Sequence, residues 1–256
     1  MGNDLTTKET TDLAPAFIDV GGPTGFEGVD NDCISIPFLR LAQSNTPQVV
    51  DREVKIAGLE AGQYFNPSTG RVYGPAPDLL LLGFYRTWTQ WTGDPPNSKF
   101  VRTVSVEEFS EKIEPAVTRD GAKVHDKDGN RYMDTRNFFV LSMAHPEDGI
   151  LIYPMSSTGI PASKKWLAKA SALRVRDKAG NLVQAPMWSR VWGLKVAYNK
   201  TPKGDYYQVV DTIDHGWVPE AFVPVAKESF RQAQEYYKDK DKISAAEDQV
   251  VEKVPF

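Results

Sequence analysis

Cationic and aromatic side chains are concentrated between residues 164 and 203. This stretch holds ten lysines and arginines and one acid, Asp177, so its formal charge is +9. A protein that binds single-stranded nucleic acid needs cations that follow the phosphates and flat rings on which unpaired bases stack, at about 1–3 kcal/mol per base. The stretch supplies both residue types. Its candidate binding residues are Lys164, Lys165, Trp166, Lys169, Arg174, Arg176, Trp188, Arg190, Trp192, Lys195 and Tyr198.

One expected strand within this stretch gives the sharpest prediction. Alternation along residues 188–198 places Trp188, Arg190 and Trp192 on the same face. An exposed Trp-Arg-Trp row is unfavourable without a ligand, whereas a row that faces the core would not normally hold an arginine. We therefore expect this face to bind bases. The alternative is that the tryptophans belong to the core and the cations form a solvated face.

A second aromatic and basic row precedes it, in the run from Phe84 to Trp91. Alternation places Arg86 and Trp88 on one face and Trp91 on the other. If Arg86 and Trp88 face outward, this strand forms the other wall of a binding groove, to which we also assign Trp91. A strand has two faces, so the alternative is that half of these aromatic residues line the core.

The charge of the chain is distributed unevenly. The net charge is −4, but residues 1–32 carry seven acids and one lysine (−6), and residues 244–256 carry three acids and one lysine (−2). The part between these ends is therefore at +4. A basic body between acidic ends is the electrostatic pattern of a protein that binds a polyanion.

Other chemistries find little support in the sequence. The only cysteine is Cys33, which excludes an internal disulfide and a cysteine-based zinc cluster. His145 and Glu147 match the H-x-E half of a zinc deaminase signature, but the P-C-x-x-C half is missing. The chain has no phosphate-binding Walker loop and no G-x-S-x-G nucleophile motif. We therefore predict a non-enzymatic protein without cofactor or metal. The paired acids Asp126/Asp128 and Asp211/Asp214 leave a divalent cation as a minor alternative.

The absence of a long apolar run bears on where the protein acts. No stretch approaches 18 consecutive apolar residues, so a membrane span is not expected. The first residues contain no apolar core of the kind found in signal peptides. These features predict a soluble, cytoplasmic protein without a membrane partner. The sequence leaves homo-oligomer formation open.

The order of expected elements defines the predicted fold. A mid-chain helix is expected over residues 162–172, after Pro161, and a C-terminal helix from residue 219 or 220 to residue 237. Strands near residues 150–153, 188–198 and 206–212 surround the first helix in the order found in OB-type barrels. We predict a mainly β or α+β fold, with an OB-like small β-barrel, a mid-chain helix, a C-terminal helix and a flexible acidic tail. Residues 1–32 form a disordered acidic extension in this scheme, 33–240 a single β-rich nucleic-acid-binding domain, and 241–256 the tail.

The last ten residues carry a family resemblance. Glu247–Phe256 is an acidic stretch that closes with Pro255-Phe256, and it resembles the acidic tail of bacterial and phage single-stranded DNA-binding proteins. This resemblance implies a role in coating single-stranded DNA with low sequence specificity in phage replication or recombination. It also implies that Asp248, Glu252, Pro255 and Phe256 recruit replication and recombination proteins, in the cytoplasm of an infected bacterial host. Lys253 interrupts the acids, which departs from the usual tail.

Two further segments are similar to phage-encoded proteins of the replication and recombination type. They are Ile36–Gln48 (IPFLRLAQSNTPQ) and Gly62–Gly74 (GQYFNPSTGRVYG). The main alternative function is a virion or host-interaction protein whose aromatic and basic surface forms a protein interface, because tryptophan and arginine are also favoured there. A nuclease that uses paired aspartates is the third alternative.

Overall fold

Two long antiparallel strands form the spine of the fold. The computed structural model describes residues 36–93, 98–120, 123–202 and 204–238. Within it, β4 (Leu79–Thr92) pairs with β8 (Asn130–Ser142) over almost their whole length, from Leu79 opposite Ser142 to Thr92 opposite Asn130. A bulge interrupts the ladder between Leu81 and Gly83. All described residues belong to one compact unit.

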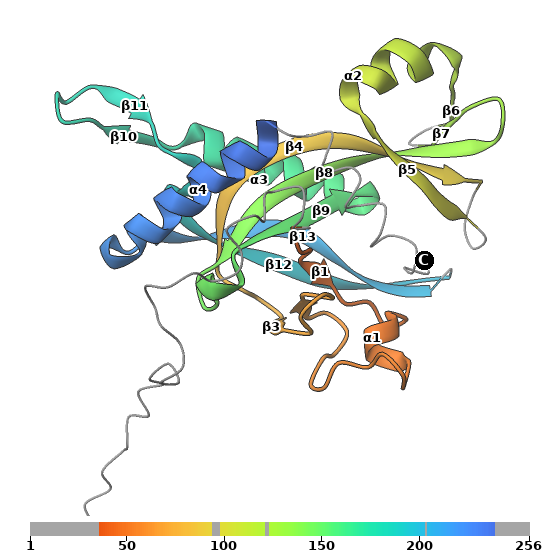
Figure 1. Ribbon diagram of the computed structural model, residues 1–256, viewed down its shortest axis with the longest axis horizontal. Helices are drawn as coiled ribbons and strands as arrows, with labels where there is room; N and C mark the ends of the chain where they lie inside the picture. Colours follow the sequence, from red (N-terminus) through yellow and green to blue (C-terminus); the bar gives the residue numbers. More distant parts are fainter. Residues whose placement is uncertain (1–35, 94–97, 121–122, 203, 239–256) are drawn as a thin grey trace, which may run out of the picture. The chain divides into compact units, whose positions relative to one another are not determined.

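The two spine strands exchange their outer neighbours midway, so the sheet has two parts (Figure 1). In the first part, β12 (Arg190–Thr201) pairs with β4, and β9 (Ile150–Ser156) pairs with β8. In the second part, β5 (Lys99–Ser105) takes the place of β12, and β7 (Lys123–His125) takes the place of β9. The outermost strands are β13 (Gly204–Trp217), beside β12, and β6 (Thr118–Asp120), beside β7.

The first part of the sheet is covered on both faces. Leu79 and Leu81 pack with Trp166 of helix α3 (Ile160–Ala172), whereas Leu80 and Leu82 pack with Ala226 and Ala233 of helix α4 (Val223–Lys238). Successive side chains of a strand point to opposite faces, and an uninterrupted leucine run is therefore what a strand between two helices requires. The second part has its own smaller core, in which Trp88, Phe109 and Tyr132 meet.

Shorter elements complete the fold. Beside β13 lies a small sheet made of the first three strands, and a two-stranded hairpin follows α3 (Figure 1). These elements are β1 (Arg40–Leu41), α1 (Pro47–Val50), β2 (Tyr64–Phe65), β3 (Val72–Gly74), α2 (Val106–Glu108), η1 (Phe109–Ile113), η2 (Glu114–Ala116), η3 (Pro146–Asp148), η4 (Ser157–Gly159), β10 (Arg174–Arg176), β11 (Leu182–Gln184), η5 (Met187–Ser189) and η6 (Glu220–Phe222).

The predicted fold class is confirmed at the level of a mainly β protein with helices. Strands β9, β12 and β13 and the helices α3 and α4 lie where the sequence indicates them. The barrel is not found: β12 pairs with β4 and β13, not with β9, and the described strands form open sheets. The predicted extension, residues 1–32, and the predicted tail with Asp248, Glu252, Pro255 and Phe256 lie outside the described residues.

Candidate nucleic-acid interface

Helix α3 separates its tryptophan from its lysines. Trp166 is fully buried and stacks on Phe138 of β8, with ring centroids 4.7 Å apart and an interplanar angle of 23°. Lys164 and Lys165 lie on the exposed side of the helix. Because the Trp166 ring is enclosed in the core, it offers no surface on which a base could stack. The two lysines are exposed, as predicted, whereas Trp166 is a core residue, as in the alternative interpretation.

The expected Trp-Arg-Trp row on β12 is wrong. Trp188 lies in the short helix η5, before the strand begins at Arg190, and packs with the core on the α4 side. Trp192 is 1% exposed and belongs to the core on the α3 side. The two tryptophans therefore face opposite layers. The strand starts two residues later than expected because the chain turns at Pro186 and forms η5 first.

Arg190 makes a different pair of contacts. Its Nε and Nη2 donate to the two carboxylate oxygens of Asp214 at 2.9 and 2.7 Å. Its guanidinium also lies 4.4 Å from the ring centroid of Trp217, which is directly opposite in the β12–β13 ladder. Trp217 is 52% exposed. It is an exposed aromatic residue that was not among the predicted binding residues. Its position opposite Arg190 depends on the register of β12 and β13, which the sequence does not reveal.

Acids of β13 neutralise other cations of the predicted stretch. Lys169 Nζ donates to Asp211 at 2.8 Å and to the Thr212 carbonyl at 2.5 Å. The hydrogen bond from Lys169 holds the pKa of the Asp211 carboxyl below its ordinary value. Lys195 is exposed and lies opposite Asp211 in the ladder. Tyr198 is 53% exposed, and its hydroxyl donates to Asp205 at 2.5 Å.

The hairpin β10–β11 carries three further cations of the stretch, whereas Lys200 is exposed on β12 and Lys203 lies outside the described residues. The hairpin extends from the end of α3 away from the sheet (Figure 1). Arg174, Arg176 and Lys178 are exposed on it, and Asp177 holds its turn by accepting from the Ala179 and Asn181 amides at 2.9 Å each. We define the cationic strip as five exposed residues on α3 and this hairpin: Lys164, Lys165, Arg174, Arg176 and Lys178. Within the described part of the chain, none of the five forms an ion pair.

The second predicted wall is divided between two environments. Arg86 and Trp88 line a groove of about 690 Å³, whereas Trp91 is 4% exposed and packs edge to face on Phe100. Arg86 donates to both oxygens of Asp134 at 2.7 and 3.1 Å. Trp88 is 6% exposed because Phe109 covers it, with centroids 3.8 Å apart. We call this hollow the arginine groove, since Arg119 and Arg131 line it too.

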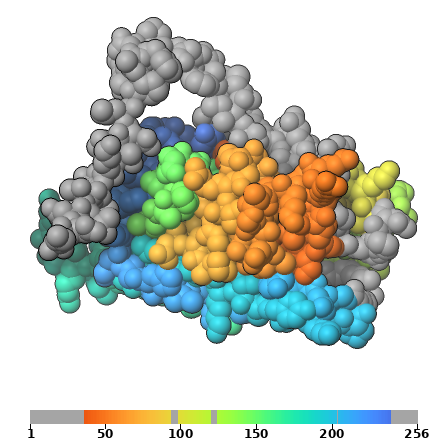
Figure 2. Space-filling view, turned by 90° about the horizontal axis from the view of Figure 1, so that it is seen from below, coloured from red at the N-terminus to blue at the C-terminus, as the bar shows by residue number. Residues whose placement is uncertain are grey.

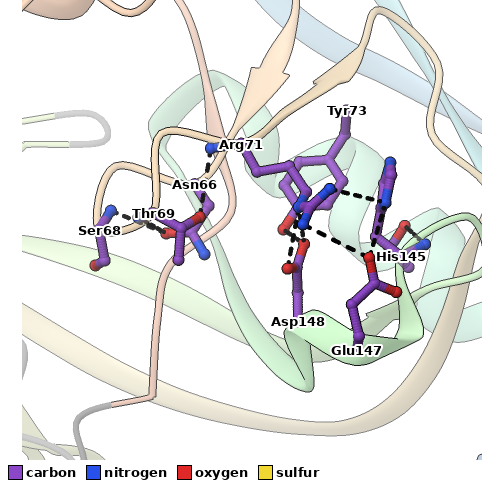
Figure 3. A network of polar contacts seen from close by, with 9 residues as sticks. Asn66, Ser68, Thr69, Arg71, Tyr73, His145, Glu147 and Asp148 are labelled. Atoms are coloured by element: carbon purple, nitrogen blue, oxygen red, sulfur yellow. Dashed lines mark hydrogen bonds and ion pairs between the residues drawn. The ribbon is translucent and has the colours of Figure 1, made fainter. Parts of the chain in front are cut away.

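A polar network connects the small sheet to the turn after β8 (Figure 3). Arg71 Nε donates to Asp148 at 3.0 Å, and the Tyr73 hydroxyl donates to the same carboxylate at 2.7 Å. Burial, followed by the bond to Asp148, raises the pKa of Tyr73. Nδ1 of His145 lies 3.2 Å from Oε1 of Glu147 and 3.2 Å from Nη1 of Arg71. The side chains of this network bond to one another, so the network holds the loops in place. His145 and Glu147, the H-x-E pair, belong to it.

The paired aspartates also have structural partners. Asp126 accepts from the Asp128 and Asn130 amides at 2.9 Å each and so stabilises the turn before β8. Asp211 and Asp214 are engaged by Lys169 and Arg190. In residues 36–238, apart from the short undescribed gaps, there is no group of three potential metal ligands. No described helix combines the length and apolar character that a membrane span needs.

Comparison with known proteins gives one family. No curated protein and no solved structure matches the chain. The family model of the Pam3 phage gp34-like protein matches residues 7–244, which covers nearly all of the sequence. The chain therefore belongs to the Pam3 phage gp34-like protein family.

Proposed function

We propose that this phage protein binds single-stranded DNA with low sequence specificity and that the cationic strip contacts the phosphates. The observation that carries the proposal is the state of the five strip residues. They are exposed and form no ion pair in the described structure, whereas Lys169 and Arg190 of the same stretch are paired with Asp211 and Asp214. Unpaired cations on a surface attract phosphates and release the counterions that condense on them.

Trp217 supplies the stacking surface in this proposal. Its ring is half exposed, and Arg190 covers one side of it at 4.4 Å. The hairpin base and Trp217 are near one another in the fold, because β12 begins shortly after the hairpin ends and Arg190 pairs with Trp217. An unpaired base stacks on such a ring regardless of its identity, which fits low sequence specificity. Trp217 thus takes over the role first assigned to Trp188 and Trp192.

Membership of a phage family supports the biological setting. The protein would act in an infected bacterial host, during DNA replication or recombination, without catalysing a reaction itself. Partner proteins would be recruited by the tail residues Asp248, Glu252, Pro255 and Phe256. The role of the tail follows from its resemblance to the acidic tails of single-stranded DNA-binding proteins.

Charge reversal on the strip tests the proposal. Binding of fluorescent oligo-dT is measured by anisotropy at several salt concentrations. The variants K164E/K165E and R174E/R176E should each weaken binding at least tenfold at low salt, and the slope of log K against log salt should become shallower by about 0.7 for each phosphate that the variant no longer neutralises. The matched control is K227E/K238E on α4, which changes the net charge equally on the other face of the sheet. Unchanged binding in both strip variants, or no binding by the wild-type chain at low salt, would refute the proposal.

A protein interface is the second candidate function. It is favoured by Leu182 and Val183, which are 66% and 38% exposed on the same hairpin. A two-stranded hairpin is marginally stable without a partner, and exposed apolar residues at its end suit contact with another protein. Co-migration of the protein with phage particles, loss of that co-migration in L182S/V183S, and no retention on a single-stranded DNA column would support this role in a virion or host interaction over DNA binding.

A further inference from the structure

We propose that the arginine groove binds a nucleoside phosphate, either a free nucleotide or the phosphorylated end of a DNA strand. The groove lies on the second part of the sheet and contains none of the cationic strip residues. The proposal goes beyond DNA coating and stands on the groove alone.

Three parts of the chain form the groove. Strands β4 and β8 contribute Arg86, Trp88 and Asp134, and the segment between β5 and β7 contributes Phe109 and Arg119. The third wall is the start of α3, with Ser157, Ile160 and Pro161. The volume of about 690 Å³ lies within the range of about 300–1,000 Å³ that small-molecule sites occupy. A mononucleotide fits this volume.

Positive charge exceeds negative charge where the groove meets the spine strands. The lining holds three arginines, Arg86, Arg119 and Arg131, and two carboxylates, Glu114 and Asp134, which pair with Arg119 and Arg86. Arg136 does not line the groove but is directly opposite Arg86 in the β4–β8 ladder. Like charges in directly opposed positions repel each other. Asp134 accepts from Nε and Nη2 of Arg86, so that carboxylate is already engaged. Among the described residues, the buried Nε of Arg136 has no hydrogen-bond partner. The charge of Arg136 adds to the positive potential around Arg86, which a phosphate bound in the groove would balance.

The entrance to helix α3 adds to the same potential. Ile160 and Pro161 form its first turn and line the groove. The Ile160 amide donates to the Ser157 carbonyl and Pro161 has no N–H, so the helix acts here through its dipole and not through hydrogen bonds from these two residues. The N-terminal end of a helix carries partial positive charge and favours anions. Helix and guanidinium groups therefore attract a phosphate from two walls of the groove.

A base has a planar partner beside these cations. The Arg86 guanidinium lies 5.3 Å from the ring centroid of Trp88, and Trp88 stacks in turn on Phe109. Guanidinium planes and aromatic rings are the two surfaces on which nucleobases stack in protein complexes. The two rings are largely buried and hold Arg86 in place, so the base would stack on the outer face of this guanidinium.

Calorimetric titration of the full chain with thymidine 5′-monophosphate tests the site. We expect saturable binding that falls at least tenfold in R86Q and in R119Q and stays within twofold in R231Q, a control on α4 whose arginine also pairs with acids. Arg119 is half exposed, so R119Q remains informative if R86Q does not fold. Thymidine and inorganic phosphate, titrated separately, should each bind at least tenfold more weakly than the nucleotide.

Further measurements distinguish a free nucleotide from a strand end, and this proposal from the DNA-coating proposal. A gain in affinity of 5′-phosphorylated over unphosphorylated oligo-dT, abolished in R119Q, would identify a strand end, whereas equal affinities with intact nucleotide binding would identify a free nucleotide. K164E/K165E should keep nucleotide binding, so a failure of the DNA-coating proposal can be distinguished from a failure of the nucleotide site. Absence of saturable nucleotide binding, an equal decrease in R231Q, or equal affinity for inorganic phosphate would overturn the inference.

Discussion

The side-chain amide of Gln43 pairs with both backbone groups of Tyr207. Its Nε2 donates to the Tyr207 carbonyl at 3.0 Å, and its Oε1 accepts from the Tyr207 amide at 2.7 Å. Gln43 therefore substitutes for a neighbouring strand at the outer edge of β13, and Lys169 covers the Thr212 carbonyl farther along the same strand. Figure 2 shows the first described part of the chain, in orange, lying along the blue and cyan β12–β13 hairpin. Open sheet edges promote pairing between molecules, and this contact blocks part of that edge.

Replacing Gln43 should weaken both the fold and this protection. Q43A removes two hydrogen bonds and exposes the backbone of Tyr207, so we expect a decrease of about 1–3 kcal/mol in the free energy of unfolding and faster aggregation. Urea unfolding and light scattering measure the two effects. Q48A is the control, because the Gln48 side chain has no hydrogen-bond partner in the described structure and should change stability by less than about 0.5 kcal/mol.

Gly62 should tolerate a side chain less well than Gly58. A Cβ at this position would lie 2.7 Å from Cε1 of Tyr207, and its backbone φ is +87°. Gly58 has a similar φ of +77° with open space around it. G58A measures the backbone strain alone, about 1–2 kcal/mol, and G62A should cost at least about 1 kcal/mol more because the Tyr207 ring must move. Equal effects in thermal unfolding would show that the ring yields freely.

Replacing a buried tryptophan should cost more stability than replacing an exposed one. W192A removes a ring that is 1% exposed and should destabilise the fold by about 3–5 kcal/mol, whereas W217A should cost less than about 1 kcal/mol. In the conservative pair, W217F should remove most of the oligo-dT quenching of tryptophan fluorescence, and W192F should leave it unchanged. Quenching that survives in W217F would exclude Trp217 as the stacking residue.

Stability should fall at alkaline pH. Burial raises the pKa values of Tyr64 and Tyr153 in the folded state, where their rings meet edge to face at 5.7 Å. Their unfolded-state pKa is about 10, so the neutral forms favour the fold fully below pH 10, and this contribution is lost as pH rises above it. Unfolding monitored by circular dichroism, with tyrosine ionisation followed by absorbance, should show both changes together above about pH 10. Y153F should make the decline shallower.

Local signals predicted the elements well. The turn residues Asn66–Gly70 lie between the two strands of the β2–β3 hairpin, and both helices lie within a few residues of their expected positions. Apolar spacing and turn chemistry are properties of neighbouring residues, so one sequence reveals them. The leucine run Leu79–Leu82 is typical of a buried strand, but its pattern does not say which helix covers which face.

The candidate site was harder to predict because it depends on register. Two of the ten cations in the +9 stretch are paired because β13 places Asp211 beside Lys169 and Asp214 beside Arg190. Those partners are separated in sequence by 24 residues or more, and bulges in the β12–β13 ladder shift the pairing. The short helix η5 removed Trp188 from the expected face. Composition thus indicated a basic segment, and only the pairing of strands revealed which cations remain unpaired.

The hairpin β10–β11 has a closed base, since the Ala185 amide donates to the Leu173 carbonyl at 3.0 Å. Residues 174–184 therefore form an excursion whose ends already meet, and a short turn could replace them without moving α3 or β12. Such a module can evolve separately from the scaffold that carries it. The length of this arm can therefore change without altering the leucine-rich spine.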